Sequence, residues 1–181
     1  VVHGNIIRYV QRQHATGIDL VTNYRQDWEV LLEQLARRTE SATAMGGADK
    51  LRRQRERGRL NARERIASFC DEGTFNEYGA LAGSHHPAGR EPLPGDGLVG
   101  GTARVSGRSL VIIAEDFTVK GGSIGHPNAA KRTRLVRLAL EQRLPLVLML
   151  DGAGERMDNQ NERYPNCPND LQLLADLKGS V

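Results

Sequence analysis

One stretch decides the fold of this 181-residue chain: Pro145-Leu-Val-Leu-Met-Leu-Asp-Gly-Ala-Gly154. Residues 145–150 form a continuous apolar run of strand length, which is typical of a strand covered on both faces in a βαβ unit. The run ends at an aspartate and two glycines, and ligands of open α/β sheets collect at the carboxyl ends of strands. The sequence therefore predicts an α/β fold with a candidate site directly after residue 150.

The segments before this strand predict its neighbours in the sheet. Leu98–Val105 and Leu110–Ala114 have strand composition. Ser106-Gly107-Arg108 joins them with hairpin chemistry, because glycine supplies a positive φ in a tight turn. This part of the sheet is therefore expected to be antiparallel. A further short strand is predicted over Phe75–Ala80, followed by a Pro/Gly-rich loop from Ser84 to Gly97.

Helical spacing of apolar residues predicts helices around these strands. They are expected near residues 27–40, 61–70 and 126–143, and over Leu171, Leu174 and Leu177. Asp27 and Asn61 are plausible N-caps of the first two, and Asn169 or Asp170 caps the last. A small-residue linker, Ser41–Gly47, follows the first helix.

The helix opened by His126-Pro127 is expected to pack one face on the sheet, since proline is tolerated at the first helical position. The residues expected to face the sheet are Leu135, Leu138 and Ala139. Those expected to face water are Lys131, Arg134 and Arg137.

Two glycine-rich turns follow predicted strands: Lys120-Gly-Gly-Ser-Ile-Gly125 and Asp151-Gly-Ala-Gly154. If the strands at Leu110 and Pro145 are parallel neighbours, the two turns meet at one edge of the sheet. Their backbone N–H groups could then bind a developing oxyanion or phosphates. The alternative is that the glycines only close the turns between strand and helix.

Neither turn completes a standard motif. The run from Gly152 has Met157 where a dinucleotide fingerprint requires its third glycine. Residues 121–125 match G-x-S-x-G, but a hydrolase triad needs an acid and then a histidine after the serine, and His126 is the only later histidine. No metal site is expected, because no set of ligands has suitable spacing.

Positive charge concentrates in residues 49–65, which hold eight basic and three acidic residues, a net charge of +5 that leaves −2 for the rest of the chain. Such a run forms a solvated face, or neutralises nucleic-acid phosphates, or meets the phosphates of a nucleotide-like cofactor. If helical, it places Arg52, Arg55 and Arg59 on one stripe. Only 4% of the residues are aromatic, which disfavours a stacking platform and makes nucleic acid an unexpected partner.

Cysteine content and hydropathy indicate the compartment. The two cysteines lie far apart, which predicts a reducing, cytoplasmic setting. No stretch approaches the ~18 apolar residues of a membrane-spanning helix. The first 18 residues contain arginine and no acid, which leaves the mitochondrial matrix as an alternative.

Five segments resemble, in order, the carboxyltransferase (beta) subunits of biotin-dependent acyl-CoA carboxylases, of the propionyl-, methylcrotonyl- and acetyl-CoA carboxylase type. They are Arg57-Gly-Arg-Leu-Asn-Ala-Arg-Glu-Arg-Ile66, Phe69-Cys-Asp-Glu-Gly-Thr-Phe75, Pro94-Gly-Asp-Gly-Leu-Val-Gly-Gly101, Glu115-Asp-Phe-Thr-Val-Lys-Gly-Gly122 and Leu150-Asp-Gly-Ala-Gly-Glu-Arg156. The resemblance runs from about Gly46 to Val181. It implies a crotonase-like α/β fold, with residues 1–48 an N-terminal extension and residues 49–181 the first part of the N-terminal carboxyltransferase domain.

The resemblance also implies a reaction: a carboxyl group passes from carboxybiotin, carried by a biotin carboxylase and biotin carboxyl carrier subunit, to the α-carbon of an acyl-CoA. Negative charge then develops on the thioester oxygen, which preorganised N–H donors stabilise. By resemblance the donors are the backbone N–H groups of Ala153 and Gly154. The residues implied for the acyl-CoA pocket are Gly121, Gly122, Ser123 and Gly152. A homo- or hetero-oligomer of carboxyltransferase subunits is expected.

One motif departs from the family pattern. Asp-Ser-Gly-Gly-Ala-Arg in the family corresponds to Asp151-Gly-Ala-Gly-Glu-Arg156, so Ala153 takes the place of a glycine and Glu155 adds a carboxylate. A positive φ at an alanine would cost about 1 kcal/mol. The departure leaves open an alternative, a non-catalytic carboxyltransferase-like structural subunit. The biotin side of the family's site belongs to a C-terminal domain, so residues 1–181 alone are expected to be inactive.

Overall fold

A computed structural model of the chain describes residues 20–83, 93–156 and 170–179. The chain divides into two compact units, residues 1–39 and residues 40–181, and each is described by itself. Within the described residues, no helix combines the length and the apolar composition that crossing a membrane requires.

The first described helix, α2, spans Leu20–Thr43 and is longer than the predicted helix over 27–40. Asp27 is an interior residue of α2, so its prediction as an N-cap is wrong. No proline or glycine interrupts the helix on either side of the predicted range, and extending an existing helix is favourable once it has formed. The apolar side chains of Val30, Leu31 and Leu35 are exposed.

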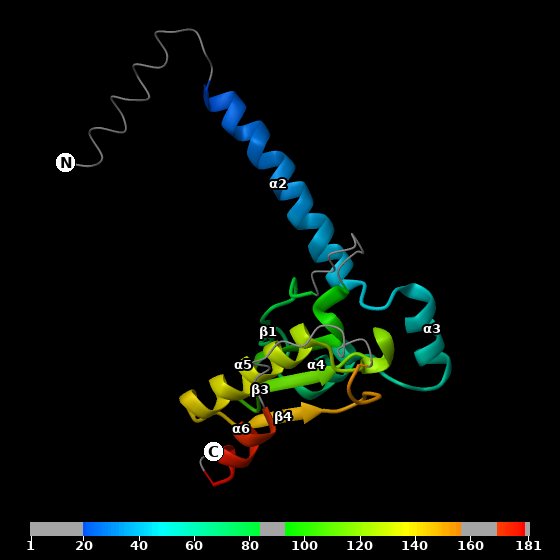
Figure 1. Ribbon diagram of the computed structural model, residues 1–181, viewed down its shortest axis with the longest axis vertical. Coiled ribbons are helices and arrows are strands. Elements are labelled where there is room, and N and C mark those ends of the chain that lie inside the picture. Colours follow the sequence, from blue (N-terminus) through cyan, green and yellow to red (C-terminus); the bar gives the residue numbers. More distant parts are fainter. Residues whose placement is uncertain (1–19, 84–92, 157–169, 180–181) are drawn as a thin grey trace, which may run out of the picture. The chain divides into compact units, whose positions relative to one another are not determined.

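A four-stranded sheet in the order β1-β2-β3-β4 forms the centre of the second unit (Figure 1). The strands are β1 (Asn76–Glu77), β2 (Leu98–Val105), β3 (Arg108–Glu115) and β4 (Leu146–Met149). β2 and β3 form the predicted antiparallel hairpin, and Ser106 and Gly107 at its turn both have positive φ, as a type I′ turn requires. β4 pairs with β3 in parallel, from Val111↔Leu146 to Ala114↔Met149.

Helices cover both faces of this sheet (Figure 1). α4 (Ala62–Phe69) lies on one face, and α5 (His126–Gln142) and α6 (Asp170–Leu177) lie on the other; α3 (Ala48–Glu56) precedes α4 in the chain. One face packs on α4 with the core residues Ala62, Ile66, Val99, Ala103, Leu110, Ile112 and Ala114. The other face packs on α5 and α6 with Leu98, Val111, Ile113, Leu135, Val136, Ala139 and Leu177. Successive residues of β3 therefore alternate between the two cores, as a pleated strand requires.

Asn61 caps α4 as predicted, in a capping box in which its side chain accepts from the Glu64 N–H at 2.9 Å and its own N–H donates to the Glu64 carboxylate at 2.9 Å. Phe69, near the end of this helix, is exposed. Cys70, one turn after Ile66, packs against the core.

Two strand predictions need correction. The strand predicted over Phe75–Ala80 is reduced to β1, and Gly79 beyond it has a positive φ that ends the extended backbone. β4 was expected to be covered on both faces, but its residues are half-buried. It is the last strand in the described sheet, so no further described strand pairs with its outer edge. In α6, Leu171 is exposed, while Leu173, Leu174 and Leu177 meet the core.

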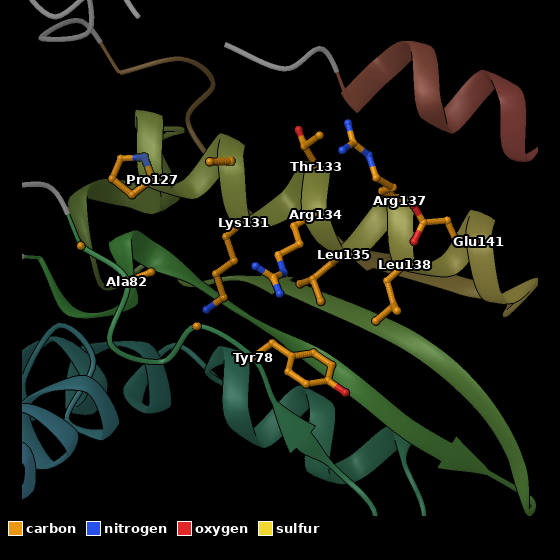
Figure 2. Close-up of a pocket in the computed structure, with 13 residues that line it drawn as sticks. Tyr78, Ala82, Pro127, Lys131, Thr133, Arg134, Leu135, Arg137, Leu138 and Glu141 are labelled. Atoms are coloured by element: carbon orange, nitrogen blue, oxygen red, sulfur yellow. The ribbon is translucent and has the colours of Figure 1, made fainter. Parts of the chain in front are cut away.

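Lys131, expected to face water, is buried with 7% of its surface exposed. Figure 2 shows its side chain extending from α5 towards the sheet, at the wall of a pocket that Tyr78 also lines. The ammonium group donates a hydrogen bond to the Leu98 carbonyl oxygen at 2.5 Å. Burial lowers the pKa of Lys131 to about 8, against a smaller opposing effect of the Glu77 carboxylate. Arg134 and Arg137 are exposed as predicted.

This lysine makes a pH-dependent contribution to stability. Below pH 8 Lys131 is protonated in both the folded and the unfolded chain, so folding bears the full cost of burying its charge. Between pH 8 and 10.5 the folded chain releases the proton while the unfolded chain retains it, and stability therefore rises with pH. We expect wild type to gain up to about 3 kcal/mol relative to Lys131→Met between pH 7 and pH 10, measured by urea denaturation. Parallel pH profiles of the two proteins would contradict this.

Candidate active site

The two glycine turns lie together at the carboxyl ends of β3 and β4. The Ala153 N–H donates to the Gly121 carbonyl oxygen at 3.0 Å, and the Ile124 N–H donates to the Gly154 carbonyl oxygen at 2.8 Å. The Arg156 N–H then donates back to the Ile124 carbonyl oxygen at 2.9 Å, so the turns continue the parallel pairing. The expectation that the turns meet is confirmed.

Glycine is required where the two turns touch. Gly122 has φ +65°, and a Cβ placed there would overlap the Asp151 carbonyl oxygen. A Cβ at Gly152 would lie 2.6 Å from the Gly122 carbonyl oxygen and 2.7 Å from a Glu115 carboxylate oxygen. These glycines therefore allow backbone to pack directly against backbone.

Acidic and arginine side chains fix the start of the second turn. The Asp151 N–H donates to Glu115 Oε2 at 2.6 Å, which ties the end of β4 to the end of β3. Arg59 Nη2 donates to Asp151 Oδ1 at 2.5 Å, and the Arg59 guanidinium lies 5.2 Å from the centre of the Phe117 ring. Arg65 Nη2 donates to the Glu115 carbonyl oxygen at 2.5 Å. Two arginines of the basic segment, Arg59 and Arg65, thus contact the turn or the strand end beside it, although Arg59 remains exposed.

A buried ion pair fixes the end of the same turn. Arg156 Nη1 donates to Asp96 Oδ1 at 2.8 Å, and Arg156 and Asp96 are 8% and 0% exposed. Asp96 also accepts from the Asn128 N–H at 2.9 Å, at the start of α5. A Cβ at Gly125 would lie 2.5 Å from Asp96 Oδ2, so glycine leaves the room that this pair occupies.

Ser123, the serine of the G-x-S-x-G match, is part of this arrangement. Its hydroxyl donates to the Lys120 carbonyl oxygen at 2.8 Å and accepts from Arg156 Nε at 3.3 Å. Arg156 Nη2 also donates to the Ser123 carbonyl oxygen at 2.9 Å. The Ser123 hydroxyl thus uses its donated and its accepted hydrogen bond to hold the turn, which is consistent with a site that has no serine nucleophile.

The backbone N–H groups of Ala153 and Gly154, in the second turn, differ in whether they donate a hydrogen bond to the protein. The Ala153 N–H is donated to Gly121, whereas no hydrogen bond from the Gly154 N–H to any described residue is recorded. Gly154 has φ +87°, while Ala153 has a negative φ, so the torsional cost considered for alanine does not arise. Glu155 is exposed, so water screens its carboxylate.

All six residues expected at the site are thus brought together at one edge of the sheet. The supporting residues Glu115, Asp96 and Asn128 were not predicted as parts of the site. Asp96 and Glu115 both lie within segments that resemble the family. The position of Asp96 between two glycines could have indicated an unusual backbone conformation there. Asn128 gave no signal, because a polar residue near a helix start is common.

Comparison with known proteins identifies the class. The chain resembles solved carboxyltransferases: a single-chain, multi-domain long-chain acyl-CoA carboxylase has a TM-score of 0.73 and 34% identity, covering 83% of this chain and 16% of that one. Transcarboxylase 12S, described as a hexamer with methylmalonyl-CoA and methylmalonic acid bound, has a TM-score of 0.68 and 28% identity, covering 81% of this chain and 28% of that one. The fold is that of the carboxyltransferases, which is crotonase-like.

The family follows from the sequence. The model of the carboxyl transferase domain family matches residues 53–169, and the chain belongs to this family. The carboxyltransferase subunit of a propionyl-CoA carboxylase from Haloferax mediterranei is 38% identical over 129 residues, 70% of this chain. The chain spans about a quarter of the length of that relative, 25%. The resemblance drawn from the sequence is confirmed.

The close contact between the turns predicts unequal effects of two glycine substitutions. Gly58 and Gly122 have φ of +70° and +65°, but only Gly122 has neighbours within 4 Å of an added Cβ. We expect Gly58→Ala to lower the free energy of unfolding by about 1–2 kcal/mol, the cost of a left-handed alanine. Gly122→Ala should cost about 1–3 kcal/mol more because it also overpacks the turn. Urea denaturation of both variants measures the difference, and equal losses would exclude the backbone contact.

Proposed function

We propose that this chain provides the acyl-CoA side of the active site in a biotin-dependent acyl-CoA carboxylase. The observation that carries the proposal is that the two glycine turns meet beside the Gly154 N–H. This N–H has no acceptor among the described residues. Membership of the carboxyl transferase domain family supports the same reaction. The carboxyl group moves from the biotin of a carrier subunit to the α-carbon of an acyl-CoA.

In the proposed reaction these residues stabilise negative charge. Removing the α-proton of an acyl-CoA places negative charge on the thioester oxygen, and fixed N–H donors at that oxygen are worth several kcal/mol. No described residue accepts a hydrogen bond from the Gly154 N–H, which suits it to this role. The Ala153 N–H joins it as a second donor when it shares or releases its hydrogen bond to the Gly121 carbonyl oxygen, which is 3.0 Å away.

Four residues line the proposed acyl-CoA pocket: Gly121, Gly122, Ser123 and Gly152. Gly121 lines a surface pocket with Lys120, and Gly152 is exposed, so both are accessible to a ligand. Gly122 and Ser123 are buried and act by shaping the turn. Carboxybiotin supplies the carboxyl group when it is bound. None of the described residues is assigned to hold biotin.

Partners and location follow from this function. The biotin carboxylase and biotin carboxyl carrier subunits are the proposed partners, within a homo- or hetero-oligomer of carboxyltransferase subunits. Residues 1–48 form the proposed N-terminal extension and residues 49–181 the carboxyltransferase part. The cytoplasm is the proposed compartment, which suits the free thiol of Cys70, and the mitochondrial matrix is the alternative.

Steady-state carboxylation by the intact complex tests the function. We expect turnover of at least one acyl-CoA from a panel of short, branched and long chains. Ala153→Gly and Glu155→Ala should change kcat by less than about tenfold, because Ala153 has a negative φ and the Glu155 carboxylate is screened by water. The side chains of Ala153 and Glu155 have no role in the proposed reaction.

The same assay distinguishes the alternative function. A non-catalytic structural subunit would assemble normally and give no carboxylation with wild type, Ala153→Gly or Glu155→Ala. Activity restored by Ala153→Gly alone would mean that the alanine disables the turn, which the backbone geometry of this site contradicts.

A further inference from the structure

A buried carboxylate lies behind the second glycine turn. It belongs to Glu115, the last residue of β3, which is 5% exposed. Its Oε2 atom accepts from the Asp151 N–H at 2.6 Å, and its Oε1 atom accepts from Arg132 Nη1 at 3.4 Å. Because both oxygens already accept hydrogen bonds from the protein, the carboxylate is suited to holding the turn rather than to taking a proton from a substrate.

Arg132 connects this carboxylate to a second one. Its side chain is 11% exposed, and its Nε atom forms an ion pair at 2.5 Å with Asp170 Oδ2, at the start of α6. A planar guanidinium held between two carboxylates has little freedom to turn. The orientation of Glu115 is therefore fixed from α5 and α6, which contain no residue of either glycine turn.

The Glu115 carboxylate also fills the space beside Gly152. A Cβ at Gly152 would lie 2.7 Å from Glu115 Oε2, which leaves no room for a side chain. The family pattern Asp-Ser-Gly-Gly-Ala-Arg has a serine at this position, whereas this chain has a glycine. The glycine and the glutamate thus fit each other, and Glu115 supports the turn from the place that a side chain at position 152 would take.

The N–H that Glu115 holds is close in the chain to the donor of the proposed reaction. Only residues 152 and 153 separate Asp151 from Gly154. Beyond Gly154, the Arg156 N–H donates to the Ile124 carbonyl oxygen at 2.9 Å. Fixing both ends of so short a segment gives the Gly154 N–H a defined direction, and a donor stabilises an oxyanion best when it is already oriented.

We propose that Glu115 is a positioning residue of the carboxyltransferase reaction. Its hydrogen bond from the Asp151 N–H, with Arg132 and Asp170 behind it, sets the direction in which the Gly154 N–H points. Glu115 does not touch the substrate and acts only through the backbone of the turn. The inference rests on the proposed function, because it takes the Gly154 N–H to be a donor to the thioester oxygen.

Replacing Glu115 in the intact complex tests this role. Glu115→Ala removes the acceptor of the Asp151 N–H, whereas Glu115→Gln keeps an oxygen that can accept from it. The matched control is Glu77→Ala, which also removes a largely buried carboxylate from the sheet, but one that is bound by Arg63, 2.7 Å away. Urea denaturation of each variant shows that it is folded.

We expect Glu115→Ala to lower kcat by about tenfold to a hundredfold and to change the acyl-CoA KM by less than about threefold, because charge on the thioester oxygen develops in the transition state. Glu115→Gln should recover most of the lost kcat, and Glu77→Ala should keep the wild-type kcat. With wild type active, an unchanged kcat in Glu115→Ala would overturn the inference and leave the proposed function standing. A raised KM at unchanged kcat would overturn it too, since it would place Glu115 in substrate binding.

Arg132→Met tests the same contacts without altering Glu115, and it decides the case in which Glu115→Ala does not fold. We expect Arg132→Met to lower kcat by about threefold or more in the wild-type background, because Glu115 then loses its orienting partner. In the Glu115→Ala background it should lower kcat no further, since Arg132 acts on the turn only through Glu115. An unchanged kcat in Arg132→Met alone, or an equal loss in both backgrounds, would overturn the inference.

Amide hydrogen exchange decides the case in which wild type gives no carboxylation, which would mean failure of the proposed function. The Ala153 and Arg156 N–H groups both donate hydrogen bonds within the joined turns, so their exchange reports how firmly the second turn is held. Faster exchange of both in Glu115→Ala than in wild type and Glu77→Ala would still support the positioning role of Glu115. Equal exchange in all three proteins would overturn it.

Discussion

The parallel pairing of β3 with β4 is the constraint on which the rest of this structure depends. Because both strands end at the same edge, the glycine turns that follow them meet and continue the pairing through Ile124 and Glu155. The contact is backbone against backbone, and Gly122 and Gly152 are the residues that permit it. The result is a turn in which Gly154 is exposed and its N–H has no acceptor among the described residues, and such a group suits the stabilisation of an oxyanion.

Several charged side chains hold this edge in place. Arg59 and Glu115 hold the start of the second turn at Asp151, and the buried Arg156–Asp96 pair holds its end. Removing one partner of a buried ion pair is usually far more harmful than losing an exposed pair.

The sequence predicted most of the fold and the meeting of the two glycine turns. The hairpin of β2 and β3, the helix from His126 and the capping by Asn61 follow from local rules of turns and caps, so they could be predicted. The full length of α2 and the burial of Lys131 could not, because both depend on the surroundings rather than on local pattern. The lysine lies on the polar side of its helix in sequence, but the segment around β1 covers it. Likewise, Arg55, Arg59, Arg63 and Arg65 form ion pairs with acidic residues of other segments, and charge counts alone do not reveal these partners.

The account depends most on where the thioester oxygen of a bound acyl-CoA lies. A crystal structure of the intact protein with an acyl-CoA measures the distance from this oxygen to the Gly154 backbone nitrogen directly. The account predicts a hydrogen bond, with a distance of about 2.7–3.2 Å. A thioester oxygen beyond about 4 Å from both the Ala153 and Gly154 nitrogens would contradict it, because no donor of the second turn would then act on the developing charge.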